Sequence, residues 1–349
     1  MTARSTHPIV QFLTQRGREL AGLVILTHDH PDPDAMASAW ALAHLTEHAC
    51  GFRPRLLYGG VIGRMENQMM VRILNIPVQP VQPNELAQLP HVALVDTQPP
   101  FQNNRFPSGR RATMVVDHHP RHAKTEAEFA HIDDKAGATA TILVEALVAA
   151  GIEPSPRLAT ALVYAISSET QNLGREAGPR DFTAYRTLFP KALMSALAKI
   201  QNPPRPESFF YTLGKAIHQA FVVGRVIGVH LGPVPNQDIV AHMADFLLSH
   251  EAMRWSIVTG RYQGRLYVSL RTRNRRAEAG RLLWRLLGSG TSAGGHATIA
   301  GGSIALGEGA SERAWSDAER QLTTVFLHSQ GHREPFAMQH PYRGIRPER

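Results

Sequence analysis

Three short apolar runs in the first half of the sequence, at 23–27, 92–95 and 113–116, are followed directly by acidic or imidazole side chains. In chain order, the potential metal ligands after these runs are His28, His30, Asp32, Asp34, Asp96, Asp117, His118 and His119. If the runs are parallel strands of one sheet, their carboxyl ends meet at one edge, where such sheets bind ligands. Carboxylates gathered there repel one another unless cations neutralise them. Mixed carboxylate and imidazole ligands suit manganese, and two ions sharing a carboxylate can clamp both oxygens of a phosphoryl transfer.

Each of these side chains, taken alone, has a structural explanation. Asp34 stands directly before a helical pattern, so it could cap that helix, and an aspartate after a strand often begins a turn. The chain has 18 histidines, so an isolated histidine carries little information. The joint pattern favours a metal centre, because caps and turns do not explain why ligands follow three separate strands.

The elements that must position these residues alternate between strand and helix through the first half of the chain. Apolar runs predict strands, and apolar residues three and four apart predict helices. The predicted strands are 23–27, 55–58, 92–95 and 113–116, and the predicted helices are 35–48, 64–74, 139–150, 156–168 and 181–188. This alternation predicts an α/β fold with a doubly wound, mainly parallel sheet.

A length of 349 residues favours two domains. The proline-rich segment 201–206 is the predicted linker, because proline removes a backbone donor and disfavours helix before it. We place a metal-binding catalytic domain at 1–200, a second, smaller mixed α/β domain at 207–328, and a flexible basic tail at 329–349. The second domain is predicted from apolar runs at 221–231, 255–259 and 266–271, a helix at 278–287 and a glycine-rich turn.

The composition indicates the partners and the location to expect for this protein. A net charge of +8 and a pI near 10 favour anionic partners such as phosphates. No apolar stretch approaches the roughly 20 residues of a membrane span, and the first 20 residues lack the apolar core of a secretory signal. We therefore expect no membrane partner and a cytoplasmic location. The single cysteine, Cys50, excludes an internal disulfide.

The motifs resemble those of the DHH phosphoesterase superfamily, whose name matches the triplet Asp117, His118 and His119. The first motif of the superfamily corresponds to 28–35, where His30 and Pro33 replace its usual asparagine and glycine. Its second motif corresponds to 95–97, and a Gly-Ala-Thr-Ala element follows at 137–140. Its fourth motif usually contains an aspartate, and the residue here is Glu169.

The second half resembles the DHH-associated substrate-binding domain, so that the resemblance covers roughly 20–325. By this resemblance Arg271 would form a bidentate fork on a phosphate, while Gly294 and Gly295 would bring backbone amides close to it, together with His296. The alternative is that 288–302 is merely a flexible turn.

The resemblance also implies roles for the ligands. His28, Asp32 and Asp96 would hold one metal ion. The second ion would be held by Asp34, Asp96, His118 and Glu169, so Asp96 would bridge the two. Manganese is the expected metal, with magnesium or cobalt as alternatives. His119 would bind phosphate or assist the leaving group, His30 would contact the phosphate or line the metal site, and Asp117 would orient an imidazole.

The implied activity is hydrolysis of small nucleotides by two-metal activation of water, as in the nano-RNase and RecJ-like branch. Expected substrates are short oligoribonucleotides, dinucleotides or 3'-phosphoadenosine 5'-phosphate. Alternatives are an inorganic pyrophosphatase or exopolyphosphatase, or a catalytically weak nucleotide-binding regulatory protein, suggested by Glu169 and Pro33. Processive exonuclease action on longer strands is less favoured, because the sequence shows no basic platform interleaved with aromatic residues. A homodimer is left open.

Overall fold

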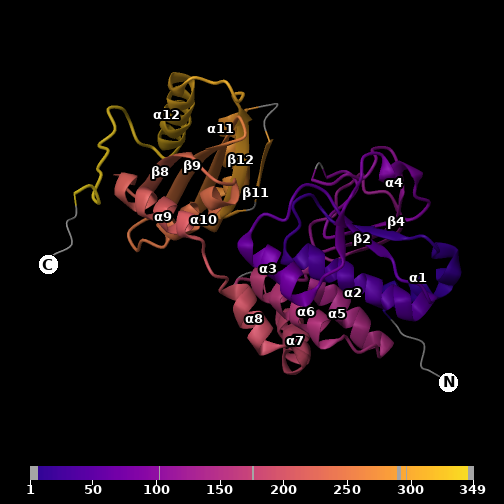
Figure 1. Ribbon diagram of the computed structural model, residues 1–349. Helices are drawn as coiled ribbons and strands as arrows, with labels where there is room; N and C mark the ends of the chain where they lie inside the picture. The colour runs from indigo at the N-terminus through magenta and orange to yellow at the C-terminus, as the bar shows by residue number, and fades with distance from the viewer. Residues whose placement is uncertain (1–6, 102, 175–176, 289–291, 296, 345–349) are drawn as a thin grey trace. The chain divides into compact units, whose positions relative to one another are not determined.

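The chain forms two compact units, Met1–Pro203 and Pro204–Arg349 (Figure 1). The computed structural model describes residues 7–101, 103–174, 177–288, 292–295 and 297–344. The division between the units falls inside the proline-rich segment 201–206. None of the described helices is both long and apolar enough to cross a membrane.

The first unit contains a sheet of six parallel strands in the order β3-β2-β1-β4-β5-β6. The strands are β1 (Val24–Leu26), β2 (Arg55–Tyr58), β3 (Val78–Pro80), β4 (Val92–Val95), β5 (Ala112–Asp117) and β6 (Ala127–Ile132). The predicted doubly wound sheet is confirmed, and its strand order reverses between β1 and β4. The sequence did not predict β3 and β6, because these edge strands carry polar and half-exposed residues instead of a continuous apolar run.

Helices cover the sheet unequally: Figure 1 shows most of them on one side and the short α4 apart from them. The helices are α1 (Pro8–Arg16), α2 (Pro33–Cys50), α3 (Met65–Leu74), α4 (Glu85–Gln88), α5 (Thr139–Ala150), α6 (Pro156–Glu169), α7 (Pro179–Leu188) and α8 (Met194–Gln201), with 3₁₀ turns at Gly17–Leu20 and Phe189–Lys191. Helix α2 is apolar almost all round because it packs against β1, α5 and α6. Its first turn is therefore held rigidly at the edge of the sheet.

The second unit contains a mixed sheet in the order β11-β12-β10-β9-β8-β7, in which only β8 and β9 pair in parallel among the described strands. The strands are β7 (Phe221–Val223), β8 (Val226–Pro233), β9 (Trp255–Tyr262), β10 (Arg265–Thr272), β11 (Ser292–Gly295) and β12 (Ile299–Ala305). The helices are α9 (Glu207–Gln219), α10 (Asp238–Leu248), α11 (Ala279–Leu287) and α12 (Glu312–Ser329), with a 3₁₀ turn at Arg275–Ala277. The apolar run at 221–231 thus spans two strands, which reverse at Gly224 with φ 56°.

Two segments of the second unit differ from the sequence-based expectation. The glycine-rich stretch after α11 contributes β11 and β12, which pair in antiparallel fashion, so its described part is sheet and not merely a turn. The tail at 329–349 is not free over its described part, because Gln339 exchanges backbone hydrogen bonds of 2.8 and 2.9 Å with Val222. Phe336 also packs against the core of this unit.

Candidate metal centre

The candidate site lies at the carboxyl ends of β1, β4 and β5, around the point where the strand order reverses. This is the position at which open parallel sheets bind ligands, because the neighbouring loops diverge there. His28 follows β1, Asp96 follows β4, and His118 and His119 follow β5. Asp32 caps α2, accepting a 3.0 Å hydrogen bond from the Ala35 amide.

His28, Asp32 and Asp96 form the first group of potential ligands. One ligand atom from each lies within 4.8 Å of the others. His28 Nε2 is 3.8 Å from Asp32 Oδ1 and 3.5 Å from Asp96 Oδ2. Burial opposes protonation of His28, but its contacts with both carboxylates outweigh burial and raise its pKa well above 6.5. The three residues are the set that the resemblance implied for one metal ion, and their binding of an ion stays a prediction.

Asp96, His118 and His119 form the second group, again with ligand atoms within 4.8 Å of one another. His118 Nε2 lies 3.6 Å from Asp96 Oδ1 and 3.9 Å from Asp34 Oδ2. Asp96 therefore belongs to both groups, with its Oδ2 toward one and its Oδ1 toward the other. It is only 3% exposed and has a φ of 61°, a left-handed conformation that aspartate tolerates better than most residues.

His118 provides the test of whether these residues fit a cation. Its Nδ1 is 3.3 Å from the Ala136 carbonyl oxygen, so a proton on Nδ1 is accounted for. Its Nε2 is buried and has no hydrogen-bond partner among the described residues, although it faces the carboxylates of Asp34 and Asp96. An imidazole lone pair facing two carboxylates is unfavourable without a cation and is the usual arrangement of a metal-binding histidine whose other nitrogen is held by a carbonyl. The residues fit divalent ions.

Asp34 is held by the start of α5. Its two oxygens accept hydrogen bonds from the backbone amides of Thr139 and Ala140, at 2.7 and 2.8 Å, and from Ser38 Oγ at 3.1 Å. Burial, followed by the nearby charges of Asp96 and other carboxylates, raises its pKa well above 3.8. The carboxylates at this edge therefore repel one another, as the sequence predicted for a centre without cations.

Asp117 and His119 form a separate hydrogen-bonded pair. Asp117 is fully buried, and its Oδ1 accepts from His119 Nδ1 at 2.8 Å. Gln98 Nε2 donates to its other oxygen at 2.7 Å, and Gln98 in turn accepts from Thr125. Burial opposes a charged His119, but the bond to Asp117 and the charge of Asp96 raise its pKa to about 9. The hydrogen bond with Asp117 fixes the orientation of the His119 ring and uses its Nδ1 atom.

Sequence reasoning assigned no roles to Gln98 and Thr139. Thr139 Oγ1 donates to Asp96 Oδ1 at 2.8 Å, so it fixes the shared carboxylate. Thr139 lies in the Gly-Ala-Thr-Ala element, so the motif could have indicated a role for it in the site. Gln98 could not have been identified from the sequence, because a glutamine after a strand is common.

Glu169 and His30, like Asp34 and Asp117, lie outside both ligand groups. Glu169 is the last residue of α6 and is half-buried, and its charge contributes to the raised pKa values of Asp34 and His119. Glu169 therefore lies near the two groups of potential ligands. His30 is exposed and turns toward Val61, with 3.2 Å between its Nδ1 and the Val61 amide nitrogen.

In the second unit, Arg271 is only 4% exposed, and its guanidinium donates to Asp245 Oδ1 at 2.5 Å and to Ser269 Oγ at 2.7 Å. These contacts hold the side chain against β10 and α10. Its expected role at a phosphate stays a prediction. Gly294 and Gly295 lie in β11 and are exposed, and His296 lies outside the described residues.

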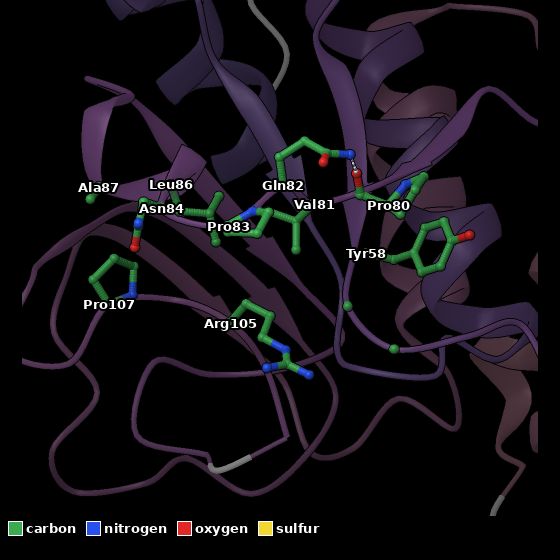
Figure 2. Close-up of a pocket in the computed structure, with 12 residues that line it drawn as sticks. Tyr58, Pro80, Val81, Gln82, Pro83, Asn84, Leu86, Ala87, Arg105 and Pro107 are labelled. Atoms are coloured by element: carbon green, nitrogen blue, oxygen red, sulfur yellow. Dashed lines mark hydrogen bonds between the residues drawn. The ribbon is translucent and has the colours of Figure 1, made fainter.

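A pocket of about 480 Å³ adjoins the segment that carries His28 and Asp32. Figure 2 shows Arg105 on one side and the segment 80–83 on the other, with Tyr58 at one end. Gly59 and Gly60 line this pocket and contact Asp29 and His30, which lie between His28 and Asp32 in the chain. A Cβ at Gly59 would lie 1.8 Å from Asp29 Oδ1, and one at Gly60 would lie 2.6 Å from the His30 ring, so a larger residue at either position would displace the side chain it meets.

The first unit contains a domain of the DHH family. Residues 22–166 match the model of the DHH family, N-terminal domain. The uncharacterized protein MJ1633 of Methanocaldococcus jannaschii is 36% identical over 289 residues, which cover 82% of this chain and 59% of that protein. The A-adding tRNA nucleotidyltransferase of Aquifex aeolicus is 28% identical over 214 residues, covering 58% of this chain and 24% of that enzyme.

The chain therefore spans about three fifths of the first of these relatives and about a quarter of the second. Among solved structures, an exopolyphosphatase-related protein from Bacteroides fragilis superposes with a TM-score of 0.67. The superposition covers 95% of this chain and all of the other, at 13% identity. At that identity it shows a shared fold and nothing about the substrate.

Asp117→Asn provides a test of the pair that orients His119. An asparagine keeps the shape of the side chain but loses the charge that holds His119 protonated and correctly turned. We expect turnover with a bound divalent metal to fall about 10–100-fold with little change in the number of bound ions. Steady-state rates and elemental analysis of the purified variant check this, and normal turnover would show that the pair is only structural.

Proposed function

We propose that this chain is a two-metal hydrolase of phosphoester or phosphoanhydride bonds and that its substrates are small nucleotides. The observation that carries the proposal is the sharing of Asp96 between two groups of potential ligands, each with atoms within 4.8 Å. A shared carboxylate would hold two ions near each other, and such a pair could stabilise both the attacking and the leaving oxygen of a displacement at phosphorus. Mixed imidazole and carboxylate ligands favour manganese over magnesium, with cobalt as a further candidate.

The protein groups around the site suggest how the reaction proceeds. When bound, two divalent ions supply a water of lowered pKa and neutralise charge on the phosphate oxygens. Thr139 and the start of α5 hold Asp96 and Asp34 in place. Because His119 Nδ1 is bonded to Asp117, a proton that His119 gives to the leaving oxygen would come from its Nε2.

The pocket beside the metal centre supports nucleotides over pyrophosphate or polyphosphate. Its walls are largely apolar, from prolines, Val81, Leu86 and Tyr58, and the amide group of Asn84 also lines it. Such walls suit a flat nucleobase, while Arg105 suits a phosphate. A purely inorganic phosphate chain would use none of the apolar surface.

A substrate panel tests the proposal. Purified protein is freed of metal, supplied with manganese, and incubated with linear and cyclic dinucleotides, short oligoribonucleotides, 3'-phosphoadenosine 5'-phosphate, pyrophosphate and short polyphosphate. Chromatography should show mononucleotide or phosphate released from the nucleotides. Release from the inorganic substrates alone would favour a pyrophosphatase or exopolyphosphatase, and tight nucleotide binding without any release would favour a regulatory protein.

A further inference from the structure

Helix α2 carries a pair of imidazoles far from its first turn. His44 and His48 stand four residues apart, so they lie on the same side of the helix on consecutive turns. Their ring centroids are 4.4 Å apart, and the ring planes are inclined at 71°. His44 follows Asp34 by ten residues, which is roughly 15 Å along the helix axis at about 1.5 Å per residue. The pair is therefore separate from the metal centre at the start of α2.

Each of the two rings has one nitrogen engaged by a backbone carbonyl. His44 Nε2 is 3.1 Å from the carbonyl oxygen of Glu153, in the loop between α5 and α6. His48 Nδ1 is 2.9 Å from the carbonyl oxygen of His44. Because a carbonyl oxygen only accepts, these nitrogens carry the proton of the neutral ring, and the lone pairs lie on His44 Nδ1 and His48 Nε2. Metal-binding histidines are usually held in this way, since the carbonyl fixes the tautomer and the orientation of the ring.

The surroundings of the pair keep His44 available as a neutral ligand. Burial lowers the pKa of His44 below 6.5, and the hydrogen bond to the Glu153 carbonyl opposes this shift only in part. At neutral pH its second nitrogen therefore holds a lone pair instead of a proton. Glu47 lies between the two histidines in the chain, but its carboxylate is paired with Arg53 Nε at 3.1 Å. His48 is exposed, so an ion can approach the pair from solvent.

Helix α2 holds the two rings in place before an ion binds. It is apolar almost all round and packs against β1, α5 and α6, so its backbone is fixed on several sides. The bond from His44 to Glu153 also joins the helix to the neighbouring loop. Ligands that are already positioned lose little conformational entropy when they bind. Two imidazoles on consecutive turns of such a helix are therefore well placed to chelate one ion.

We propose that His44 and His48 form a second metal site, which binds one late first-row divalent ion such as zinc or copper(II), with water completing its coordination. The affinity of nitrogen ligands rises from manganese to copper and is lower again for zinc, and imidazole suits zinc, copper and nickel. Carboxylates, which suit manganese and magnesium, take no part in this site. The inference uses residues outside both ligand groups of the metal centre, so it goes beyond the proposed function.

The test titrates the full chain with copper(II) alone at neutral pH. Equilibrium dialysis counts the bound ions, and electron paramagnetic resonance shows how many imidazole nitrogens bind each of them. We expect His44→Gln and His48→Gln each to weaken one of these ions at least about 10–100-fold, since that range applies to groups that merely support a ligand. The Asp96→Asn variant should keep this ion, with two imidazoles bound to it. Manganese binding should be the same in wild type and in both histidine variants.

Two comparisons make the result specific to the pair. His218→Gln is the matched control, because His218 is exposed on α9 and has no histidine three or four residues from it in the sequence. It should bind copper like wild type. The His48→Gln variant separates ligand loss from a change of fold, since the hydrogen bond that it removes lies within α2, whereas that of His44 joins α2 to another loop.

Identical copper binding by wild type, His44→Gln and His48→Gln would overturn the second site. Loss of the ion with two imidazoles in Asp96→Asn would also overturn it, because that ion would then belong to the metal centre. The substrate panel with manganese reports separately on the proposed function. A chain that binds copper through His44 and His48 but hydrolyses none of the substrates defeats only the proposed activity.

Discussion

Replacement of Asp96 by asparagine is expected to lower turnover at least about a thousandfold, which corresponds to roughly 4 kcal/mol of lost transition-state stabilisation. The substitution preserves shape and leaves an amide oxygen to accept the hydrogen bond from Thr139. It removes the one negative charge that both ligand groups share. A single neutral amide cannot hold two cations close together, so the variant should bind fewer ions as well as turn over slowly.

Rates on the most rapidly hydrolysed substrate, together with metal content by elemental analysis, measure this effect. Glu47→Gln is a matched control, because it removes one negative charge from the same helix α2 roughly 20 Å from its first turn. That control should retain wild-type rates and metal content. An Asp96→Asn protein with two bound ions and normal turnover would show that Asp96 is not a bridge and would end the two-metal proposal.

Removal of metal is expected to lower the thermal midpoint of the first unit by about 5–10 °C. A ligand present at about 100 times its dissociation constant stabilises the folded state by roughly 2.7 kcal/mol, and a domain of this size shifts by about 2–4 °C for each kcal/mol. The physical cause is the mutual repulsion of Asp34, Asp96 and Glu169, which, after burial, contributes to the raised pKa of Asp34. Cations remove that repulsion.

Scanning calorimetry with manganese and with chelator measures this shift. The Asp96→Asn variant should lose most of it, whereas Glu47→Gln should keep it. The second unit has its own core and contains neither ligand group, so its transition should not respond to manganese. Equal midpoints in manganese and chelator would indicate that the site does not bind metal in the folded chain.

Much of the first unit could be predicted from the sequence, because its central strands are continuous apolar runs. Strands β1, β2, β4 and β5 are near the predicted positions, and α5 lies at 139–150 as predicted. Such a run is a local property of the sequence, and it predicts a buried strand without knowledge of the tertiary structure. The edge strands β3 and β6 have no such signal, because their residues face solvent on part of their surface.

The individual contacts of the site depended on tertiary structure. The sequence places Asp117 beside two histidines. It could not show that Asp117 accepts a hydrogen bond from His119 Nδ1. Nor could it show that His118 Nε2 faces Asp34 and Asp96. Those contacts depend on the order of strands in the sheet and on α5 meeting α2. Neither is a property of neighbouring residues in the chain.

In the second unit, too, the sequence identified residues whose contacts only the tertiary structure decided. Sequence identified Arg271 and the glycines of β11 by motif. It could not show that the Arg271 guanidinium is buried and bonds to Asp245 of α10 and to Ser269 within β10. The sequence by itself determined which residues can carry metal chemistry and the strands after which they stand. Only the packed structure decided which of them face one another, because burial and distance depend on the whole fold.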